Sequence, residues 1–317
     1  MSIEAPPLGT QLGQDPVDID KPSSDDITLW SVTTIIGCLD KPALLYWAAE
    51  ETAKAAVSVA GSLAARIDED GEEETVKWLR DARFRRPKDR LSAASLGTVT
   101  HALCESYALD GVRPDRDRAA TEVRKEGGAK MPAAAVKAEA AVAMSMLDRF
   151  DEFLSDWQPA YDATEVTVYS PTYGYAGTAD AFLTLDGVPL IADYKTSRES
   201  YDARGKPKTP YPETGLQLAA YRYAEMAAVW RPRRYESFRR RYYVLSGAEQ
   251  DQAVAVPEVD GGVVIHLSPE RYGLYPMRCD EAVHQAFLFV QEAARYSFEM
   301  SKQIVGAEMA PSTRAVA

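Results

Sequence analysis

The sequence predicts an α/β protein with a mixed central β-sheet, flanked by helices and preceded by an α-helical N-terminal half. Four expected helices fall before residue 158, and the run 133–144 is rich in Ala, the strongest helix former. The segments 174–186 and 189–196 are rich in Tyr, Phe, Leu, Val and Ile and meet at a turn, Asp186-Gly187, which is typical of two adjacent strands. With 317 residues and 46% apolar content, the chain is long enough to bury one large core.

The order of the elements follows from hydrophobic periodicity and from turn residues. Helices are expected at 40–64, 70–81, 92–109, 131–156, 213–229 and 280–302. Strands are expected at 162–170, 174–186, 189–196, 239–246 and 262–268. We expect one domain at 29–303, divided into a helical front part (29–157) and an α/β core (158–303). The Pro-, Gly-, Asp- and Ser-containing segment 1–28 is expected to be a disordered leader, and 304–317 a flexible tail.

Two aspartates and a lysine lie on the two central expected strands. Asp180 ends the pattern G-T-x-D, and Asp193 and Lys195 form a D-x-K pattern after an apolar stretch. Side chains alternate along a strand, so Lys195 faces the same side as Asp193, and a hairpin brings Asp180 beside them. Mg²⁺ and Mn²⁺ prefer carboxylate oxygens, and such a cation activates a water and neutralises charge on a scissile phosphate. The lysine would orient or deprotonate that water, or stabilise the transition state. An isolated D-x-K is more often a surface ion pair, but the upstream G-T-x-D favours a site.

Two further residue pairs lie four apart on expected helices, so that each pair shares one helix face. His101 and Glu105 belong to the helix 92–109 and could reach one metal ion. Gln217 and Tyr221 belong to the helix that begins at residue 213; the amide could order a water or a phosphate oxygen, and the phenol could stack or donate a hydrogen bond. Each pair alone also fits a solvated face, a buried histidine with a satisfied hydrogen bond, or simple packing.

Together these patterns resemble the RecB-type branch of the PD-(D/E)XK nuclease superfamily. The four patterns, in chain order, are G-T-x-x-H-x-x-x-E (97–105), G-T-x-D (177–180), D-x-K (193–195) and Q-x-x-x-Y (217–221). The resemblance covers roughly residues 31–300, and the segment 31–45 looks like the start of stand-alone members from phages and bacteria, of the RecE/RecB-like kind. It implies a restriction-endonuclease-like core and a phosphodiester hydrolase.

The resemblance also implies a role for each matching residue. The implied metal ligands are the side chains of His101, Asp180 and Asp193 and the backbone carbonyl of Tyr194. The implied catalytic set is Glu105, Asp180, Asp193, Lys195, Gln217 and Tyr221, with Lys195 as the catalytic lysine and the last two as the accessory motif. Glu165 matches an acidic residue often seen in such nucleases.

The expected cofactor is Mg²⁺ or Mn²⁺. Some relatives hold an iron–sulfur cluster with four cysteines, but this chain has only Cys38, Cys104 and Cys279, none in a C-x-x-C pattern, so no cluster is expected. The unpaired cysteines, together with the lack of a signal peptide and of a bilayer-spanning apolar run, favour the reducing cytoplasm of a bacterial or phage-infected cell, without membrane association.

The net charge of −12 is distributed unevenly. Residues 1–30 and residues 66–75 each contribute −5, so the remainder is close to neutral. Basic residues concentrate at 80–90 and at 230–243, where they are interleaved with aromatic residues; a DNA contact and a merely solvated face or linker fit each stretch equally well. The residues expected to contact DNA are Arg83, Arg85, Arg86, Arg90, Arg198, Lys206, Lys208, Arg239 and Arg240. The loop 198–212 is expected to be a mobile, DNA-facing flap.

The expected activity is that of a metal-dependent exonuclease acting on DNA ends in recombination or repair. The resemblance is closest to stand-alone phage-type members, which implies a single-strand annealing or recombinase partner, and ring-forming relatives suggest a homo-oligomer. The alternatives are a structure-dependent endonuclease or flap nuclease, and a non-catalytic module that binds DNA ends. The sequence contains no G-x-x-x-x-G-K-[ST] loop, so helicase activity would require a separate protein.

Overall fold

A computed structural model describes residues 17–39, 42–81, 90–230, 232–238 and 240–306. The helices of this described part are α1 Val32–Ile36, α2 Pro42–Ser58, α3 Leu63–Asp70, α4 Glu72–Arg80, α5 Ala93–Asp110, α6 Arg116–Gly127, α7 Ala133–Trp157, α8 Glu213–Arg222, α9 Gly247–Gln250, α10 Glu281–Arg295 and α11 Ser301–Ile304, with a short 3-10 turn η2 at Ala60–Ser62 and a π-helical turn η4 at Tyr296–Met300. The strands are β1 Val17–Ile19, β2 Ile27–Ser31, β3 Ala160–Ser170, β4 Tyr175–Leu185, β5 Val188–Thr196, β6 Met226–Ala227, β7 Arg233–Ser237, β8 Arg240–Leu245, β9 Val254–Ala255, β10 Gly261–Ser268 and β11 Arg271–Met277.

The strands of the described residues join one mixed sheet that branches at β4. Strand β4 is antiparallel to β3 and to β5, and it also pairs in parallel with β2 at one end. Strand β5 continues the sheet through a parallel pairing with β10, which is antiparallel to β11. The other branch runs β2, β8, β7 and β1. The central strands β4 and β5 therefore lie where both parts of the sheet meet.

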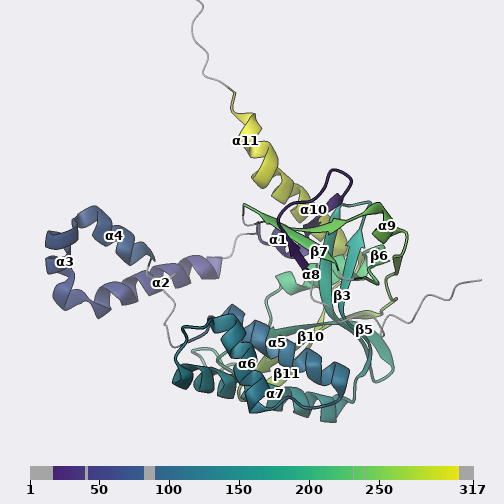
Figure 1. Cartoon of the computed structure of the whole chain (residues 1–317), viewed down its shortest axis with the longest axis horizontal. Helices are drawn as coiled ribbons and strands as arrows, with labels where there is room; N and C mark the ends of the chain where they lie inside the picture. The colour runs from purple at the N-terminus through teal and green to yellow at the C-terminus, as the bar shows by residue number, and fades with distance from the viewer. Residues whose placement is uncertain (1–16, 40–41, 82–89, 231, 239, 307–317) are drawn as a thin grey trace, which may run out of the picture.

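Helices cover both faces of the sheet. Helices α5, α6 and α7 pack on one face, against side chains that include Leu183 and Tyr194. Helices α1, α8 and α10 pack on the other face, against side chains that include Phe182 and Ile191. Successive residues of β4 and β5 thus alternate between two hydrophobic cores, as expected for a strand buried on both faces. Figure 1 shows α5, α6 and α7 grouped on one side of the strands, and α1, α8 and α10 on the other.

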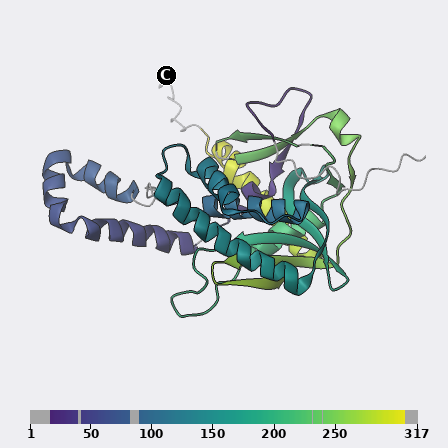
Figure 2. The same cartoon turned by 60° about the horizontal axis from the view of Figure 1, so that its bottom comes forward.

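Helices α2, α3 and α4 form an arm that stands away from the sheet in both views (Figures 1 and 2). Its exposed apolar side chains include Leu45, Tyr46 and Val57. None of the helices in the described part of the chain combines the length and the apolar character needed to cross a bilayer.

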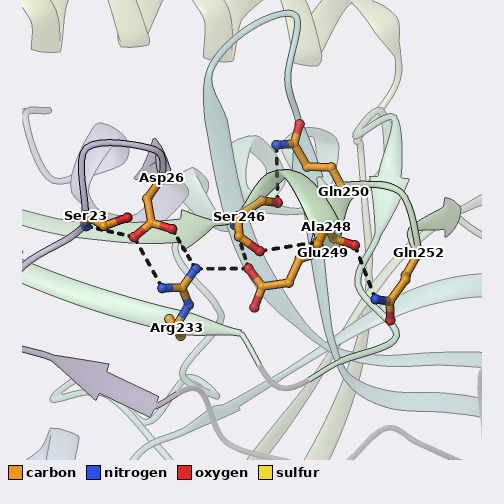
Figure 3. A network of polar contacts seen from close by, with 8 residues as sticks. All are labelled: Ser23, Asp26, Arg233, Ser246, Ala248, Glu249, Gln250 and Gln252. Carbon is orange, nitrogen blue, oxygen red and sulfur yellow. Dashed lines mark hydrogen bonds and ion pairs between the residues drawn. The ribbon is translucent and has the colours of Figure 1, made fainter.

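The N-terminal strands are attached to the sheet by a charged network, drawn in Figure 3. The Arg233 guanidinium donates to both oxygens of Asp26, at 2.9 and 3.3 Å, and to Glu249 Oε2 at 3.0 Å. The hydrogen bonds from Arg233 lower the pKa of Asp26 to about 2. Glu249 and Ser246 also form a capping box at the start of α9. The network thus joins the chain before β2 to the start of β7.

The α/β class with a mixed sheet flanked by helices is confirmed, but some expected boundaries are wrong. The expected leader 1–28 overlaps β1 and the start of β2, because these strands pair with β7 and β8. The expected helix 213–229 ends at Arg222, since the chain then enters β6, which pairs with β3. The sequence analysis missed the helices α1, α6 and α9 and the strands β1, β2, β6, β7, β9 and β11. Residues 1–16 and 307–317 lie outside the described part.

Candidate active site

The site begins where the pairing of β4 and β5 stops. The antiparallel register ends at Ala181 opposite Ala192, so the next position on each strand carries Asp180 and Asp193. Beyond this point a side chain, and no longer the backbone of β4, makes the hydrogen bond between the two strands. Asp180 Oδ2 accepts a hydrogen bond from the Tyr194 backbone N–H at 2.7 Å. The two aspartates thus stand at a fork between two strands, and their expected role as metal ligands stays a prediction.

Asp193 is held by a cation and an amide. The Lys195 ammonium lies 2.8 Å from Asp193 Oδ1 and 2.6 Å from Oδ2. Gln217 Nε2 donates to Oδ1 at 2.9 Å and also to Tyr221 Oη at 3.2 Å. The D-x-K pattern on β5 and the Q-x-x-x-Y pattern on α8 therefore form one connected polar group.

Burial sets the electrostatics of this group. The Asp193 side chain is only 1% exposed, and this burial raises its pKa, while the neighbouring ammonium of Lys195 opposes the shift. For Lys195, burial lowers the pKa, but the charges of Asp193 and Asp180 outweigh it and raise the pKa overall. The Lys195 ammonium therefore compensates the negative charge of the buried Asp193 carboxylate.

His101 reaches the fork from the face of the sheet opposite to the one that α8 covers. It projects from α5, and its Nδ1 lies 3.7 Å from Asp180 Oδ2. Its ring also packs edge-on against Tyr194, with 5.9 Å between the ring centroids. The structure thus brings together His101, Asp180, the backbone of Tyr194 and Asp193.

A cleft of about 750 Å³ opens at the fork. His101 and Glu105 line it from α5, Gln217 and Tyr221 from α8, and Glu165 from β3. The charged lining residues are Glu105, Glu122, Lys125, Glu126, Glu165, Asp180, Lys195, Arg234 and Arg241. Asp193 lies beneath this surface, covered by Lys195 and Gln217.

Glu165 occupies a strained position at the same level of the sheet. The β3–β4 register pairs Thr164 with Ala181 and Val166 with Ala179, which sets Glu165 opposite Asp180. Its φ angle is 49°, in the left-handed region that a non-glycine residue inside a strand rarely adopts. Glu165, Asp180 and Asp193 thus occupy neighbouring positions on three adjacent strands.

These residues fit a divalent cation by their chemistry. Asp193 is a buried carboxylate, and its compensating charge is the Lys195 ammonium, which contacts both of its oxygens. Carboxylate and carbonyl oxygens such as those of Asp180, Asp193 and Tyr194 are the donors that Mg²⁺ and Mn²⁺ prefer. Within the described residues, no three His, Cys, Asp or Glu side chains yet converge as a formed metal centre.

The residues expected to contact DNA fall into three groups. Arg83, Arg85, Arg86 and Arg239 lie outside the described residues. Arg90 and Lys206 are exposed, Lys208 is paired with Glu199 at 2.6 Å, and Arg240 stacks on aromatic rings. Arg198 is different, because its guanidinium is buried, donates to the Leu91 carbonyl and pairs with buried Glu139. That arrangement gives Arg198 a structural role and leaves the DNA contact expected for it without support.

The loop expected to be a flap carries extensive internal hydrogen bonds. The Asp202 carboxylate accepts from the backbone N–H groups of Arg204 and Lys206, and Tyr201 bridges to Pro207. The backbone N–H of Lys208 donates to the Ser200 carbonyl. The segment thus forms a small hairpin of its own, and its expected role as a mobile, DNA-facing flap stays a prediction.

The sequence analysis missed two arginines in the cleft, Arg234 and Arg241. They come from β7 and β8, which face each other in an antiparallel pair with Arg234 opposite Tyr243. The basic stretch 230–243 indicates positive charge in this region. To tell that Arg241 faces the cleft and Arg240 does not, one needs the correct bounds of the strand, because side chains alternate along it.

Comparison with known proteins yields a family and distant solved structures. A family model described as the PD-(D/E)XK nuclease superfamily matches residues 75–306, a stretch that contains the whole fork. Among curated proteins, no sequence matches this chain significantly. A solved structure described as "Crystal structure of SSO0001" is similar over 71% of this chain and 90% of that chain, at 15% identity and a TM-score of 0.26, and carries no functional argument.

Proposed function

The chain belongs to the PD-(D/E)XK nuclease superfamily, and from this membership we propose that it is a metal-dependent DNA exonuclease that hydrolyses phosphodiester bonds at DNA ends. The observation that carries the proposal is the fork, where Asp180, Asp193, Lys195 and Gln217 meet at the floor of an open cleft. The RecB-type branch, and a role in recombination or repair, belong to the same proposal and rest on the order of the four sequence patterns.

The residues of the fork divide the chemistry among them. Asp180, Asp193, His101 and the Tyr194 carbonyl would hold Mg²⁺ or Mn²⁺. When bound, such a cation supplies Lewis-acid chemistry, activating a water and neutralising charge on the phosphate. Lys195 would orient that water and stabilise the negative charge that develops as the water oxygen attacks phosphorus and the bond to the leaving oxygen breaks.

Gln217 and Tyr221 would position the Asp193 carboxylate and would not react themselves. The Gln217 amide donates to Asp193 Oδ1 and to Tyr221 Oη, so it fixes one oxygen of the carboxylate. Tyr221 is buried, which keeps α8 at a fixed distance from the fork. Positioning of this kind contributes to rate because small displacements of reacting groups are costly.

A cleavage assay tests the proposal. End-labelled linear DNA and covalently closed circular DNA are incubated with Mg²⁺, Mn²⁺ or EDTA, beside the variants Lys195→Ala and Asp193→Asn. We expect the wild type to degrade the linear DNA and not the circles, and to do so only with metal. We expect neither variant to degrade DNA. The position of the label then gives the polarity.

Two other results would replace the proposal. Cleavage of the closed circles would favour a structure-dependent endonuclease or flap nuclease. Binding to DNA ends without any cleavage would favour a non-catalytic end-binding module. An annealing or recombinase partner and a homo-oligomer remain predictions from the resemblance.

A further inference from the structure

A second pocket, of about 570 Å³, lies next to the active-site cleft. It is formed by α1, by the β7–β8 hairpin and by the π-helical turn η4. The two hollows adjoin, since Thr33 and Arg241 line both. Its size is within the range of pockets that take small ligands.

Basic side chains outnumber acidic ones among the described residues that line this pocket. Arg240, Arg241 and Lys302 line it, and none of the three forms an ion pair with another described residue. The Thr34 side chain bonds both the N–H and the carbonyl of Arg241, at 2.9 and 3.3 Å, and so fixes the backbone there. One acidic residue, Glu236, also lines the pocket and lies opposite Arg241 in the β7–β8 register. An excess of basic over acidic side chains in a hollow favours a polyanionic ligand.

Aromatic rings stand among these charges. The Arg240 guanidinium lies 5.8 Å from the centre of the Phe298 ring, and Lys302 Nζ lies 6.0 Å from that of Phe238. Phe298 belongs to η4, and single π-helical turns are frequent at functional sites. Rings beside basic groups form the surface on which unpaired bases stack, while the cations contact phosphates.

The local structure does not explain why residue 238 is a phenylalanine. It lies at the tip of the β7–β8 hairpin, 87% exposed, with a φ angle of 50°. A hairpin turn that requires positive φ favours Gly, Asn or Asp, and a bulky residue there is strained. Neither burial nor turn geometry accounts for a phenylalanine, whereas a stacking surface for a ligand does.

We propose that this pocket binds the unpaired nucleotides of a DNA end, with Phe238 stacking on a base and Arg240, Arg241 and Lys302 contacting phosphates. The proposal rests on the proposed nuclease function and specifies its substrate. DNA ends that carry a single-stranded tail would bind more tightly than blunt ends, and because the two hollows adjoin, a tail bound in the pocket would lie close to the fork.

The test measures binding without catalysis. Fluorescence anisotropy in EDTA compares a blunt duplex with the same duplex carrying a short single-stranded tail. For Phe238→Ala we expect affinity for the tailed duplex to fall by about tenfold or more, which is the cost of a lost base stack, with little change for the blunt duplex. The matched control is Phe289→Ala, which removes another exposed ring, on α10, and should bind both duplexes as the wild type does.

Two more variants separate stacking from folding and from charge. Phe238→Gly relieves the positive φ, so it should keep or raise the melting temperature while losing the preference for the tail. Arg240→Ala and Lys302→Ala should each lower the salt dependence of tail binding by about 0.7 in the logarithmic slope, and Lys137→Ala on α7 should not.

The proposal is overturned if Phe238→Gly keeps the tail preference, or if Phe238→Ala weakens both duplexes equally. It is also overturned if the wild type binds blunt and tailed ends with the same affinity. Hydrolysis of blunt linear DNA, measured separately with metal, reports on the fork alone, so failure of the pocket and failure of the nuclease proposal give different results.

Discussion

Gly177 lies directly against the ring of Tyr221. A Cβ atom at position 177 would stand 2.4 Å from Tyr221 Cε1 and 3.0 Å from its Oη. Tyr221 is buried, and its Oη accepts a hydrogen bond from Gln217, which in turn holds Asp193. The glycine of the G-T-x-D pattern is therefore required by the tyrosine of the Q-x-x-x-Y pattern, because only a residue without a side chain admits that ring.

Gly177→Ala should damage activity more than stability. The added methyl group must push the Tyr221 ring, and with it Gln217, away from Asp193, at an overpacking cost of about 1–3 kcal/mol. Displacement of the positioning group should lower the rate of DNA hydrolysis by about a hundredfold. Gly247→Ala is the control, since a Cβ there meets no atom within 4 Å and activity should not change. Equal activity in the two variants would show that the ring has room to move.

The sequence predicts that Asp180, Asp193 and Lys195 lie together because the information for this is local. Alternation along a strand places Asp193 and Lys195 on one face, and a short turn places Asp180 beside them. It does not predict that pairing stops at Ala181, nor that Glu165 adopts a positive φ, because both depend on where neighbouring strands are held. In the same way a basic residue in a loop looks like a DNA contact until a distant helix supplies a buried partner.

Arg198 should contribute to stability, not to DNA binding. Its side chain and that of Glu139 are 11% and 6% exposed, so Arg198→Ala leaves an unpaired buried charge. The expected loss is about 3–5 kcal/mol of unfolding free energy, measured by urea denaturation. The control is Lys208→Ala, which removes a more exposed pair with Glu199 and should cost at most about 1 kcal/mol. If Arg198→Ala were as stable as Lys208→Ala but bound DNA more weakly, the structural role would be wrong.

His266 should make the fold sensitive to mild acid. It lies buried on β10 with Nδ1 unpaired, and burial, with the charges of Arg271 and Lys208, lowers its pKa from 6.5 to about 4. A lowered folded-state pKa gives stability that is complete above the unfolded pKa of 6.5 and is lost as pH falls toward 4. At about pH 5 the loss from this group should reach about 2 kcal/mol relative to pH 7.5.

The variant His266→Gln isolates this contribution. Urea unfolding at the two pH values should show a smaller decrease for the variant than for the wild type, because the carboxylates and His284 titrate equally in both proteins. An identical decrease would mean that His266 is solvated and titrates normally in the folded state.

A divalent cation that binds the fork should stabilise the folded chain even without DNA. A ligand that binds only the folded state adds about 2.7 kcal/mol when its free concentration is a hundred times its dissociation constant. Mn²⁺ should therefore raise the melting temperature of the wild type, and EDTA should reverse the effect. In Asp180→Asn the hydrogen bond from the Tyr194 N–H survives, since the amide oxygen still accepts it, but one charged ligand is gone and the shift should largely disappear.

Asp186→Asn is the control, because Asp186 lies in the β4–β5 turn with a φ of 48°, which asparagine also tolerates. An equal Mn²⁺ shift in both variants would place the stabilising metal elsewhere on the protein and contradict the ligand role of Asp180.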